Sequence, residues 1–465
     1  MIKKKYTQIL PLLTKKSSDL IIYDDENGDI NFSQFIKIEN FIKKNLKRKC
    51  LILFIGDNDS TSIAHYLAFI RQCHCQIMLE KNVTDNNLKQ INLKFKPEYI
   101  FISKNRPLIN GYKILKTIGN YHLLKSDIIN YSVIKKELAL LIPTSGSTGE
   151  SKFVKITFEN LFENTISIIK YLNLNQKDIG ISTLPISYSY GISVINSHLF
   201  NESNFVCNKH SYLEKKFWHS IKKHNVTNFS GVPFSFELLD RINFYDFDFH
   251  NVKFFTQAGG KLNSEIIKKI CNQFINKNIN FFVMYGQTEA SPRISYIELK
   301  DLIKKPESVG KPIPGGRIII SKGKIGEVIY IGKNIYKGYA NNRADLKKLS
   351  NIKKLKTGDL GFLDKDGFLF LKGRLDRDVK IYGRRINLDV IENYINNFKE
   401  KKYLCIKSNQ NLYIIYIKSI NETVMKKKIL NEFNIPINII KFKKLHKLPI
   451  NKNNKISYSK ILIDE

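Results

Sequence analysis

The chain has 465 residues, which at about 100–200 residues per domain predicts two or more domains. Hydrophobic residues make up 43% of it, enough to bury a sizeable core. No apolar run approaches the roughly 18 residues that cross a bilayer, which excludes a membrane-spanning helix. The N-terminal segment is basic, but its apolar run is short and broken by proline, so we expect no signal peptide and a cytoplasmic protein.

The formal charge of +34 allows three interpretations. A basic face could bind nucleic acid or an anionic membrane, the charge could attract polyanionic substrates, or the composition could simply have drifted. The lysines are scattered in short runs, without a basic stripe interleaved with aromatic residues and without a nucleic-acid motif. We favour drift and disfavour nucleic acid as a partner.

Six cysteines are spread along the chain, and only Cys73 and Cys75, which flank His74, lie close together. A zinc site needs about four ligands, usually as two spaced pairs, and no second pair exists. We therefore expect the cysteines to be small buried hydrophobes in a reducing compartment.

The first part of the chain alternates apolar strands with helices. The apolar runs predict strands at residues 51–55, 76–79 and 99–102, and the intervening patterns predict helices at residues 61–70 and 88–95. Such alternation is typical of a parallel α/β sheet.

A second alternating stretch follows the midpoint. Apolar residues at helical spacing predict helices at residues 213–221 and 266–274, the second capped by Asn263 or Ser264. Further strands are predicted at residues 226–229, 252–255 and 281–284.

After about residue 316, short strands and glycine-rich turns dominate. Residues 362–363 and 368–371, joined by the turn 364–367, predict a hairpin. We therefore predict an α/β protein whose large N-terminal body of α/β sheets, residues 1–372, carries a small antiparallel β module. Residues 373–465 would form a small α+β C-terminal domain.

A loop rich in glycine and hydroxyl groups separates apolar strands at residues 138–142 and 153–156. Its sequence is Pro143-Thr-Ser-Gly-Ser-Thr-Gly-Glu-Ser-Lys152. Glycines let backbone N–H groups and hydroxyls wrap around an anion, and Lys152 adds a cation. The spacing of a Walker loop is absent. Such a loop alone is more often a linker, but its position between two strands favours an anion site.

Four motifs occur in one order: Pro143–Lys152, Met284-Tyr-Gly-Gln-Thr-Glu289, Thr357-Gly-Asp359 and the run Gly373–Ile386. Together they resemble the core motifs of the adenylate-forming superfamily, over roughly residues 20–460. That superfamily contains acyl-CoA synthetases, adenylation domains of nonribosomal peptide synthetases and beetle luciferases. The resemblance implies that ATP and Mg²⁺ activate a carboxylic acid to an acyl-adenylate, with release of pyrophosphate. The acyl group would then pass to the thiol of CoA or of a carrier-protein phosphopantetheine.

The resemblance also implies where the nucleotide phosphates would bind. The β- and γ-phosphates would be held by Lys152 and by the loop residues Thr144, Ser145, Gly146, Ser147, Thr148 and Gly149. Thr288 would contact the α-phosphate, and Glu289 would bind Mg²⁺, which suits a hard cation held by one carboxylate and phosphate oxygens.

The nucleoside would lie against other motifs of the same resemblance. Gly259 and Gly260 would let the backbone approach the adenine, and Tyr285 would stack on it. Asp359 would accept hydrogen bonds from the ribose hydroxyls, with Arg374 nearby.

The resemblance gives the C-terminal domain a catalytic lysine and a hinge. Lys455 would reach the active site and stabilise charge on the carboxylate and the α-phosphate, and the frame Pro449-x5-Lys-Ile selects it over Lys452 and Lys460. Asp376 occupies the hinge position, about which the small mobile domain would rotate between the two half-reactions.

Tyr188 stands where the family often has histidine, and with Gly191 it would line the acyl pocket. Members that activate α-amino acids carry an aspartate nearby to pair the ammonium, yet residues 181–201 contain no acidic residue. A buried ammonium without a counter-charge is costly, so we favour an uncharged acyl or aryl tail. CoA is the simpler acceptor, and a carrier protein would be a separate chain.

Two alternatives stay open. The chain could be an amino-acid-activating carrier-protein ligase, or a catalytically inactive basic binding protein with the same fold. Departures from the family pattern include Ser151 and Phe153 around the loop lysine, Asp389 in place of glutamate, and Asn454 before the tail lysine. None of them removes a charge that the chemistry needs, so we expect an active enzyme.

Overall fold

The computed structural model describes residues 20–128, 133–143, 152–321, 323–381, 384–396, 403–408, 411–417, 420–433, 435–450, 456, 458 and 461. The chain divides into two compact units. Unit 1 comprises residues 1–317 and 331–355, and unit 2 comprises residues 318–330 and 356–465. Unit 2 thus takes in most of the antiparallel module together with the C-terminal segment, and a domain boundary between residues 372 and 373 stays a prediction.

Unit 1 contains an eight-stranded sheet, called sheet B here, with the order β19-β9-β8-β4-β3-β5-β7-β6. Its central strands β8, β4, β3 and β5 are parallel, and the five strands predicted for this region are confirmed with small shifts at their ends. The bounds are β3 (Leu51–Phe54), β4 (Cys75–Met78), β5 (Tyr99–Ser103), β6 (Tyr112–Ile118), β7 (Tyr121–Ser126), β8 (Leu138–Pro143), β9 (Phe153–Thr157) and β19 (Tyr339–Ala340).

A nine-stranded sheet, sheet A, completes unit 1 with the order β16-β15-β14-β13-β12-β10-β11-β1-β2. Strands β12 and β13 are confirmed but begin two residues later than predicted, while β14 is extended by one residue at each end. The bounds are β1 (Ile21–Tyr23), β2 (Ile30–Asn31), β10 (Ile179–Ile181), β11 (Asn204–Val206), β12 (Asn228–Gly231), β13 (Phe254–Gln257), β14 (Asn280–Tyr285), β15 (Ser295–Ile297) and β16 (Lys311–Pro312).

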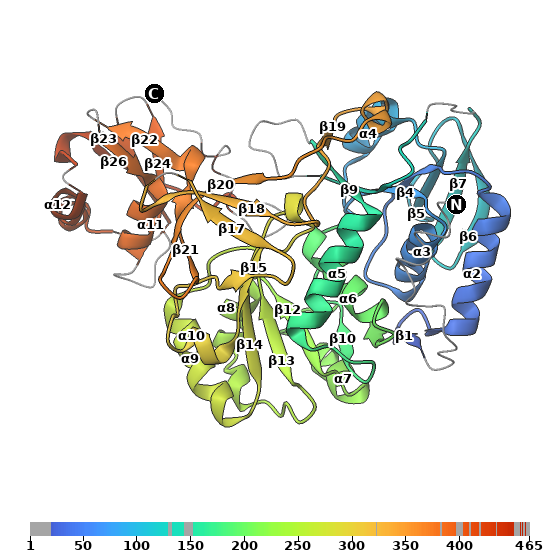
Figure 1. Cartoon of the computed structure of the whole chain (residues 1–465), viewed down its shortest axis with the longest axis horizontal. Coiled ribbons are helices and arrows are strands. Elements are labelled where there is room, and N and C mark those ends of the chain that lie inside the picture. The colour runs from blue at the N-terminus through green and yellow to red at the C-terminus, as the bar shows by residue number, and fades with distance from the viewer. Residues whose placement is uncertain are drawn as a thin grey trace. The chain divides into compact units, whose positions relative to one another are not determined.

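Three helices lie between the two sheets (Figure 1). Helix α3 contacts β1 and β4, α5 contacts β9, and α6 contacts β10 and β11 and packs on α5. Helix α4 packs on the opposite face of sheet B, and α8, α9 and α10 pack on sheet A. The bounds are α2 (Phe32–Asn45), α3 (Ser60–Arg71), α4 (Asp85–Phe95), α5 (Phe158–Leu172), α6 (Ser189–Leu199), α7 (Lys215–Lys223), α8 (Pro233–Arg241), α9 (Ser264–Asn276) and α10 (Leu299–Leu302).

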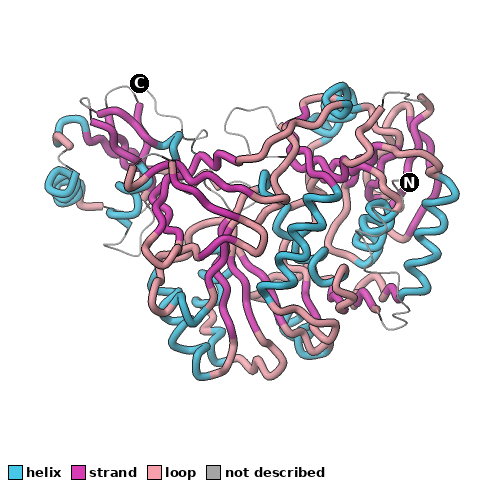
Figure 2. The backbone as a smooth tube through the Cα atoms, in the orientation of Figure 1, coloured by secondary structure: helices cyan, strands magenta, loops and turns pink. Residues whose placement is uncertain are grey.

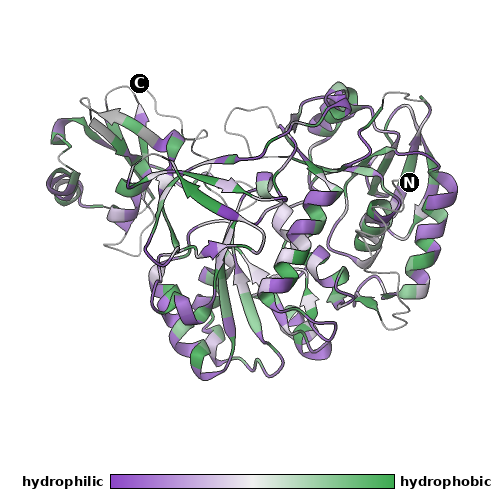
Figure 3. Cartoon of the chain, in the orientation of Figure 1, coloured by the Kyte–Doolittle hydropathy of each residue, from purple (hydrophilic) through white to green (hydrophobic). Residues whose placement is uncertain are grey.

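The strands and helices follow from local sequence. Strand β3 is fully buried on both faces, which explains its uninterrupted apolar sequence. Asn263 caps α9 by accepting a hydrogen bond from Glu265 N at 2.8 Å, as predicted. Figure 3 shows purple and green on the same helices, as expected where one side is buried and the other exposed. Leu213 was predicted to lie in a helix, but it precedes α7 and is exposed, because α7 begins only at Lys215.

Unit 2 contains a four-stranded sheet, sheet C, with the order β17-β18-β20-β21, followed by a hairpin and a three-stranded sheet (Figure 2). The predicted hairpin is confirmed, because β20 and β21 pair antiparallel across the turn at Gly367, whose φ is +81°. The bounds are β17 (Arg317–Ile320), β18 (Gly326–Ile331), β20 (Leu355–Leu363), β21 (Leu369–Arg374), β22 (Asp378–Ile381), β23 (Arg384–Asn387), α11 (Leu388–Asn396), β24 (Leu404–Ser408), β25 (Asn411–Tyr416), α12 (Glu422–Phe433) and β26 (Ile440–Lys444). The predicted fold class, α/β with an antiparallel module and an α+β C-terminal segment, is confirmed.

The cysteines are free, and all but the half-buried Cys73 are buried. Burial raises the pKa of the Cys50 and Cys75 thiols to about 12, so both stay protonated. Within the described ranges, no cluster of three or more histidine, cysteine or acidic side chains could hold a metal. A search of the same ranges finds no helix that is both long and apolar enough to cross a membrane.

A buried ion pair attaches the returning segment of unit 1 to sheet B. Arg343, in the short helix η4 (Arg343–Lys347), donates to the two carboxylate oxygens of Glu98 at 2.6 and 3.0 Å. The side chains are only 8% and 9% exposed, and Glu98 also accepts from Leu51 N at 2.8 Å. Removal of one partner would leave the other charge buried and uncompensated.

We predict that Glu98→Gln lowers the free energy of unfolding by about 3–5 kcal/mol. Urea denaturation of the purified chain measures this change. The matched control is Asp127→Asn, because Asp127 pairs with Lys113 at 3.3 Å on an exposed surface, and its loss should cost less than about 1 kcal/mol. If both substitutions lowered the free energy of unfolding by the same amount, the buried pair would not be the stronger stabilising interaction that we infer.

Candidate functional site

Two neighbouring strands of sheet A bring predicted site residues to one edge. Strands β13 and β14 are parallel, and Gln257 is in register with Val283. Gly259 and Tyr285 each follow these positions by two residues, so they lie beside each other at the carboxyl ends of the strands. This edge is where open α/β sheets bind ligands. The structure therefore brings the two predicted adenine-binding positions together.

Gly259 also contacts the predicted acyl pocket. Its φ of +91° favours glycine, and an added Cβ would lie 2.9 Å from the Tyr188 hydroxyl oxygen. The exposed Gly260 has more room, with its nearest neighbour 3.2 Å from an added Cβ, and its carbonyl accepts from Gln257 Nε2 at 2.9 Å. The glycine pair thus lets the backbone lie directly against Tyr188.

The turn after β14 carries Thr288 and Glu289 on the short helix η3 (Thr288–Ala290). Thr288 Oγ1 lies 3.2 Å from Ser189 Oγ, at the start of α6. Gly286 leaves no space for a side chain, because an added Cβ would lie 1.8 Å from the carbonyl oxygen of Pro292. This close packing fixes the turn and holds the predicted α-phosphate contact next to α6.

Glu289 is oriented by a residue that the sequence did not single out. The Tyr339 hydroxyl donates to Glu289 Oε1 at 2.9 Å, and Tyr336 N donates to Glu289 O at 2.8 Å. Burial, reinforced by the Glu289 charge, raises the pKa of Tyr339, so its hydroxyl remains a donor at neutral pH. Tyr339 is one of 23 tyrosines, and nothing in its local sequence marks it.

These residues fit a divalent cation that also binds a nucleotide. Glu289 is a half-buried carboxylate at the mouth of the turn, with one oxygen held by Tyr339. Mg²⁺ is usually held by one or two carboxylates together with phosphate oxygens and water, rather than by a cage of protein ligands. A single carboxylate in this position therefore suits Mg²⁺ bound with a polyphosphate.

The predicted acyl pocket lies at the start of α6. Tyr188 precedes the helix and is half-buried; burial raises the pKa of its hydroxyl, and the nearby Arg293 charge opposes that shift. Gly191 packs against the preceding turn, because an added Cβ would lie 2.2 Å from the carbonyl oxygen of Pro185. Gly191 also borders a small cavity, whose lining includes Thr183 and Phe205.

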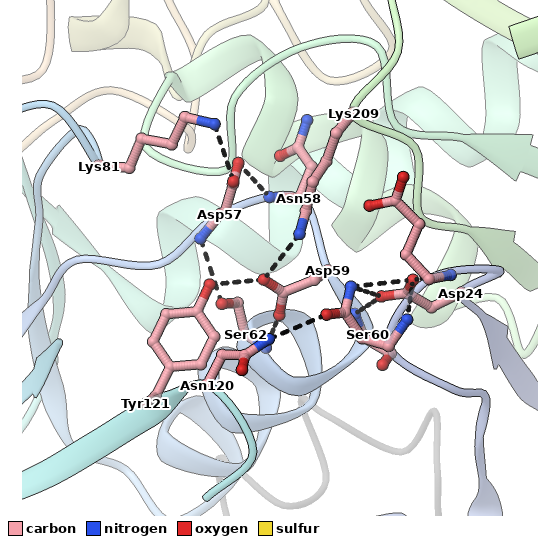
Figure 4. A network of polar contacts seen from close by, with 12 residues as sticks. Asp24, Asp57, Asn58, Asp59, Ser60, Ser62, Lys81, Asn120, Tyr121 and Lys209 are labelled. Atoms are coloured by element: carbon pink, nitrogen blue, oxygen red, sulfur yellow. Dashed lines mark hydrogen bonds and ion pairs between the residues drawn. The ribbon is translucent and has the colours of Figure 1, made fainter. Parts of the chain in front are cut away.

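Asn58, which belongs to a polar network around Asp59 (Figure 4), holds the turn that precedes Tyr188. It donates from Nδ2 to Leu184 O at 3.0 Å and accepts from Ile186 N at 2.9 Å. Next to it, Asp59 caps α3 and accepts a hydrogen bond from the Tyr121 hydroxyl. The network thus ties the pocket turn to sheet B.

The loop predicted to bind phosphate is described only at its end. Lys152 is exposed and directly precedes β9. The predicted residues Thr144, Ser145, Gly146, Ser147, Thr148 and Gly149 lie outside the described residues, and so does Lys455.

Unit 2 brings together the predicted ribose and hinge residues. Asp359 and Arg374 are paired across β20 and β21, with Arg374 Nη1 donating to Asp359 Oδ1 at 3.2 Å. Arg374 Nε also contacts Asp376 Oδ1 at 3.3 Å, and Arg374 N donates to Asp389 Oδ2 at 2.8 Å. Asp376 lies in the short helix η5 (Leu375–Arg377), and its side chain is 65% exposed, as suits a residue that is free to change conformation.

Comparisons with known proteins identify the family and the fold. Residues 58–340 match the family model described as AMP-binding enzyme. The chain is 26% identical over 310 residues to the oxalate–CoA ligase of Saccharomyces cerevisiae, which covers 63% of this chain and 55% of the relative. It is 22% identical over 411 residues to the D-alanine–D-alanyl carrier protein ligase of Lacticaseibacillus rhamnosus, with 81% and 79% covered. For the first of these relatives the match thus spans only about half of its length.

A solved structure shows the same fold. It is the O-succinylbenzoate coenzyme A synthetase of Bacillus subtilis in complex with ATP and magnesium ion, with a TM-score of 0.75 and 20% identity. The likeness covers 97% of this chain and 98% of the other.

We predict that Gly286→Ala lowers the free energy of unfolding by about 1–3 kcal/mol, because the new methyl group overlaps a backbone carbonyl that cannot move freely. Thermal or urea unfolding measures the loss. Gly260→Ala is the control, since its Cβ would meet only a proline side chain at 3.2 Å, and its effect should stay within about 0.5 kcal/mol. A fully stable Gly286→Ala protein would show that the turn is looser than its packing indicates.

Proposed function

We propose that this chain, which belongs to the AMP-binding enzyme family, activates a carboxylic acid with Mg²⁺-ATP and transfers the acyl group to a thiol. The observation that carries the proposal is the contact between the Gly259 backbone and Tyr188 at the carboxyl edge of sheet A. In this proposal the residues suited to a nucleotide, with Tyr285 and Thr288 near them, would lie against the wall of the acyl pocket. An acid and the α-phosphate of ATP could therefore meet without any protein nucleophile.

In the first half-reaction, a carboxylate oxygen of the acid bonds to the α-phosphorus, and the bond from that phosphorus to pyrophosphate breaks. Thr288 would donate to the α-phosphate, and Glu289 would hold the metal in an orientation set by Tyr339. Mg²⁺ bound there would neutralise charge that develops on the leaving pyrophosphate. In the second half-reaction a thiol sulfur attacks the acyl carbon, the thiol proton is lost and AMP leaves.

The acid is proposed to be an acyl or aryl acid rather than an α-amino acid. Residues 181–201, which form the pocket turn and α6, contain no carboxylate to pair an ammonium. Tyr188, Tyr190 and Gly191 supply aromatic and apolar surface instead. The carrier-protein ligase among the relatives, named for D-alanine, keeps an amino-acid substrate as the second candidate.

Unit 2 is proposed to supply the ribose contact and the mobile part of the machinery. Asp359, whose side chain is only 13% exposed and is held by Arg374, would accept the ribose hydroxyls. Residues 373–465 would rotate about Asp376, so that Lys455 serves only the adenylation step. The acceptor thiol would belong to CoA or to a separate carrier protein.

Pyrophosphate release tests the first half-reaction. We predict that Mg²⁺-ATP releases pyrophosphate with one class of fatty, aryl or hydroxy acids and not with α-amino acids. Each acid is assayed with and without CoA, because stimulation by CoA identifies the acceptor, whereas its absence points to a carrier protein. Release with α-amino acids alone would favour the second candidate, and no release with any acid would contradict the proposed function.

The two half-reactions should separate by mutation. We predict that Lys455→Ala reduces adenylate formation by at least about 100-fold, as expected for loss of a charge that stabilises the transition state. Thioester formation from supplied acyl-adenylate should be largely retained. Asp376→Pro should do the reverse, because proline fixes φ at the hinge.

Mass spectrometry of adenylate and thioester in single-turnover reactions distinguishes these outcomes. The control is Asp366→Pro, at an exposed turn position two residues after Asp364, which should affect neither step. Equal loss of both half-reactions in either site variant would rule out the assignment of that residue to one step.

A further inference from the structure

Arg293 is a buried cation whose partners are neutral. It lies between η3 and β15, and only 2% of the residue is exposed. Its Nε donates to the Tyr171 hydroxyl at 3.3 Å, and its Cζ lies 4.4 Å from the centroid of the Tyr190 ring. Within the ranges that the structure describes, no carboxylate forms an ion pair with it.

Two other arginines that are shielded from solvent pair with carboxylates. Arg343 forms two hydrogen bonds with Glu98, and Arg377 contacts both Asp389 and Glu392 at 2.6 Å. A guanidinium stays charged inside a protein, and a buried charge without an opposite charge is strongly unfavourable. A ring face and one hydroxyl offset only part of this cost. Arg293 is therefore poised to accept an anion that the described part of the chain does not provide.

The position of Arg293 identifies where that anion would come from. Tyr190 follows Tyr188 on the pocket wall, and the two rings lie 6.3 Å apart in an edge-to-face arrangement. Tyr188 is half-buried and contacts Gly259, whereas Tyr190 is only 2% exposed and bonds to Thr256 in β13 at 2.8 Å. A chain of contacts thus runs inward from Gly259, through Tyr188 and Tyr190, to the guanidinium.

We propose that Arg293 binds a second carboxylate, at the far end of the acid that the enzyme activates. This inference rests on the proposed function and narrows its substrate class to acids with an anionic tail. A carboxylate can accept two parallel hydrogen bonds from a guanidinium, so the pair gives both neutralisation and orientation. The activated carboxylate would then lie at the opposite end, next to Thr288.

This proposal revises the expectation of an uncharged tail. That expectation rested on the lack of acidic residues at positions 181–201, which argues against a cationic tail but not against an anionic one. An arginine four residues after Glu289 carries no signal by itself, because 76 residues of the chain are lysine or arginine. Only its burial and its neutral neighbours distinguish it.

The test uses matched pairs of acids on the full chain. Succinate, glutarate and phthalate are compared with their mono-methyl esters, which keep the shape but lose the second charge, and pyrophosphate release is measured for each. We expect kcat/KM for at least one diacid to exceed that of its ester by at least about 10-fold, the value of a hydrogen bond to a charged group. In Arg293→Met this preference should disappear, mainly through a higher KM for the diacid.

Two further variants separate substrate binding from a structural role. Arg293→Lys keeps the charge and should retain part of the diacid preference, whereas Tyr171→Phe changes the same cluster without removing charge and should leave the ratio unchanged. Thermal shift gives a second measurement: the preferred diacid alone should raise the Tm of the wild type but not of Arg293→Met.

The outcomes distinguish the inference from the function on which it rests. Pyrophosphate release with uncharged acids or esters, at equal or higher kcat/KM than with diacids, would overturn the role of Arg293 and leave the proposed function intact. An unchanged preference in Arg293→Met would do the same. No release with any acid of either set would overturn both. If Arg293→Met does not fold, the wild-type ratio between diacid and ester still decides.

Discussion

The candidate site depends on one buried amide, that of Asn334. Its Nδ2 donates to the carbonyl oxygens of Ala290 at 2.6 Å and Arg293 at 2.7 Å, and the backbone carbonyl of Asn334 accepts from Ser291 Oγ at 2.8 Å. The turn after β14 has no regular secondary structure beyond a single short helix, so its buried carbonyls need partners from elsewhere. An asparagine amide offers two donors, and both are used here.

This one side chain joins two distant parts of unit 1. The turn carries Thr288, Glu289 and Arg293, while the segment that contains Asn334 continues to Tyr339, which orients the Glu289 carboxylate. The same segment ends in the Arg343–Glu98 pair on sheet B. The position of the predicted metal ligand is thus fixed from both sides, by close packing of Gly286 within the turn and by hydrogen bonds from the returning segment.

The sequence predicts features that depend on residues close together in the chain better than features that depend on contacts between distant residues. Strands such as β3 are evident because burial on both faces demands a continuous apolar run, and the cap of α9 is evident because Asn263 acts on its own helix. The glycines after β13 were identified because they follow a strand and resemble a family motif. The domain boundary and the roles of the loop hydroxyls and Lys455 stay predictions.

The residues that the sequence did not reveal act over long separations. Tyr339 lies 50 positions after Glu289, and Arg293 meets Tyr171 across 122 positions. No local pattern marks such contacts, because their meaning arises only when the sheet edge and the helices between the sheets assemble. Helix α7 was placed correctly, but Leu213 was included in it because spacing alone does not show where a helix begins.

The excess of basic residues affects which partners the buried cations have. With 42 acidic residues against 76 basic ones, the chain has fewer carboxylates than cations, and some shielded cations have other partners. Lys49 instead donates to three backbone carbonyls, and desolvation lowers its pKa to about 8. The buried Lys155 donates to the carbonyls of Asp345 and Lys348, and burial likewise lowers its pKa. A lysine can also respond to burial by losing its proton.

Among the residues that the structure describes, Arg293 has no such set of backbone carbonyls, and a guanidinium does not lose its proton in a protein. It pairs with no carboxylate in the described part of the chain, and its Nε reaches only a hydroxyl. Compositional drift would account for the number of cations in the chain, but not for the burial of one of them against a hydroxyl and a ring face. An acid that brings its own negative charge would resolve that imbalance only while it is bound. The same electrostatics would then select acids with an anionic tail over uncharged ones.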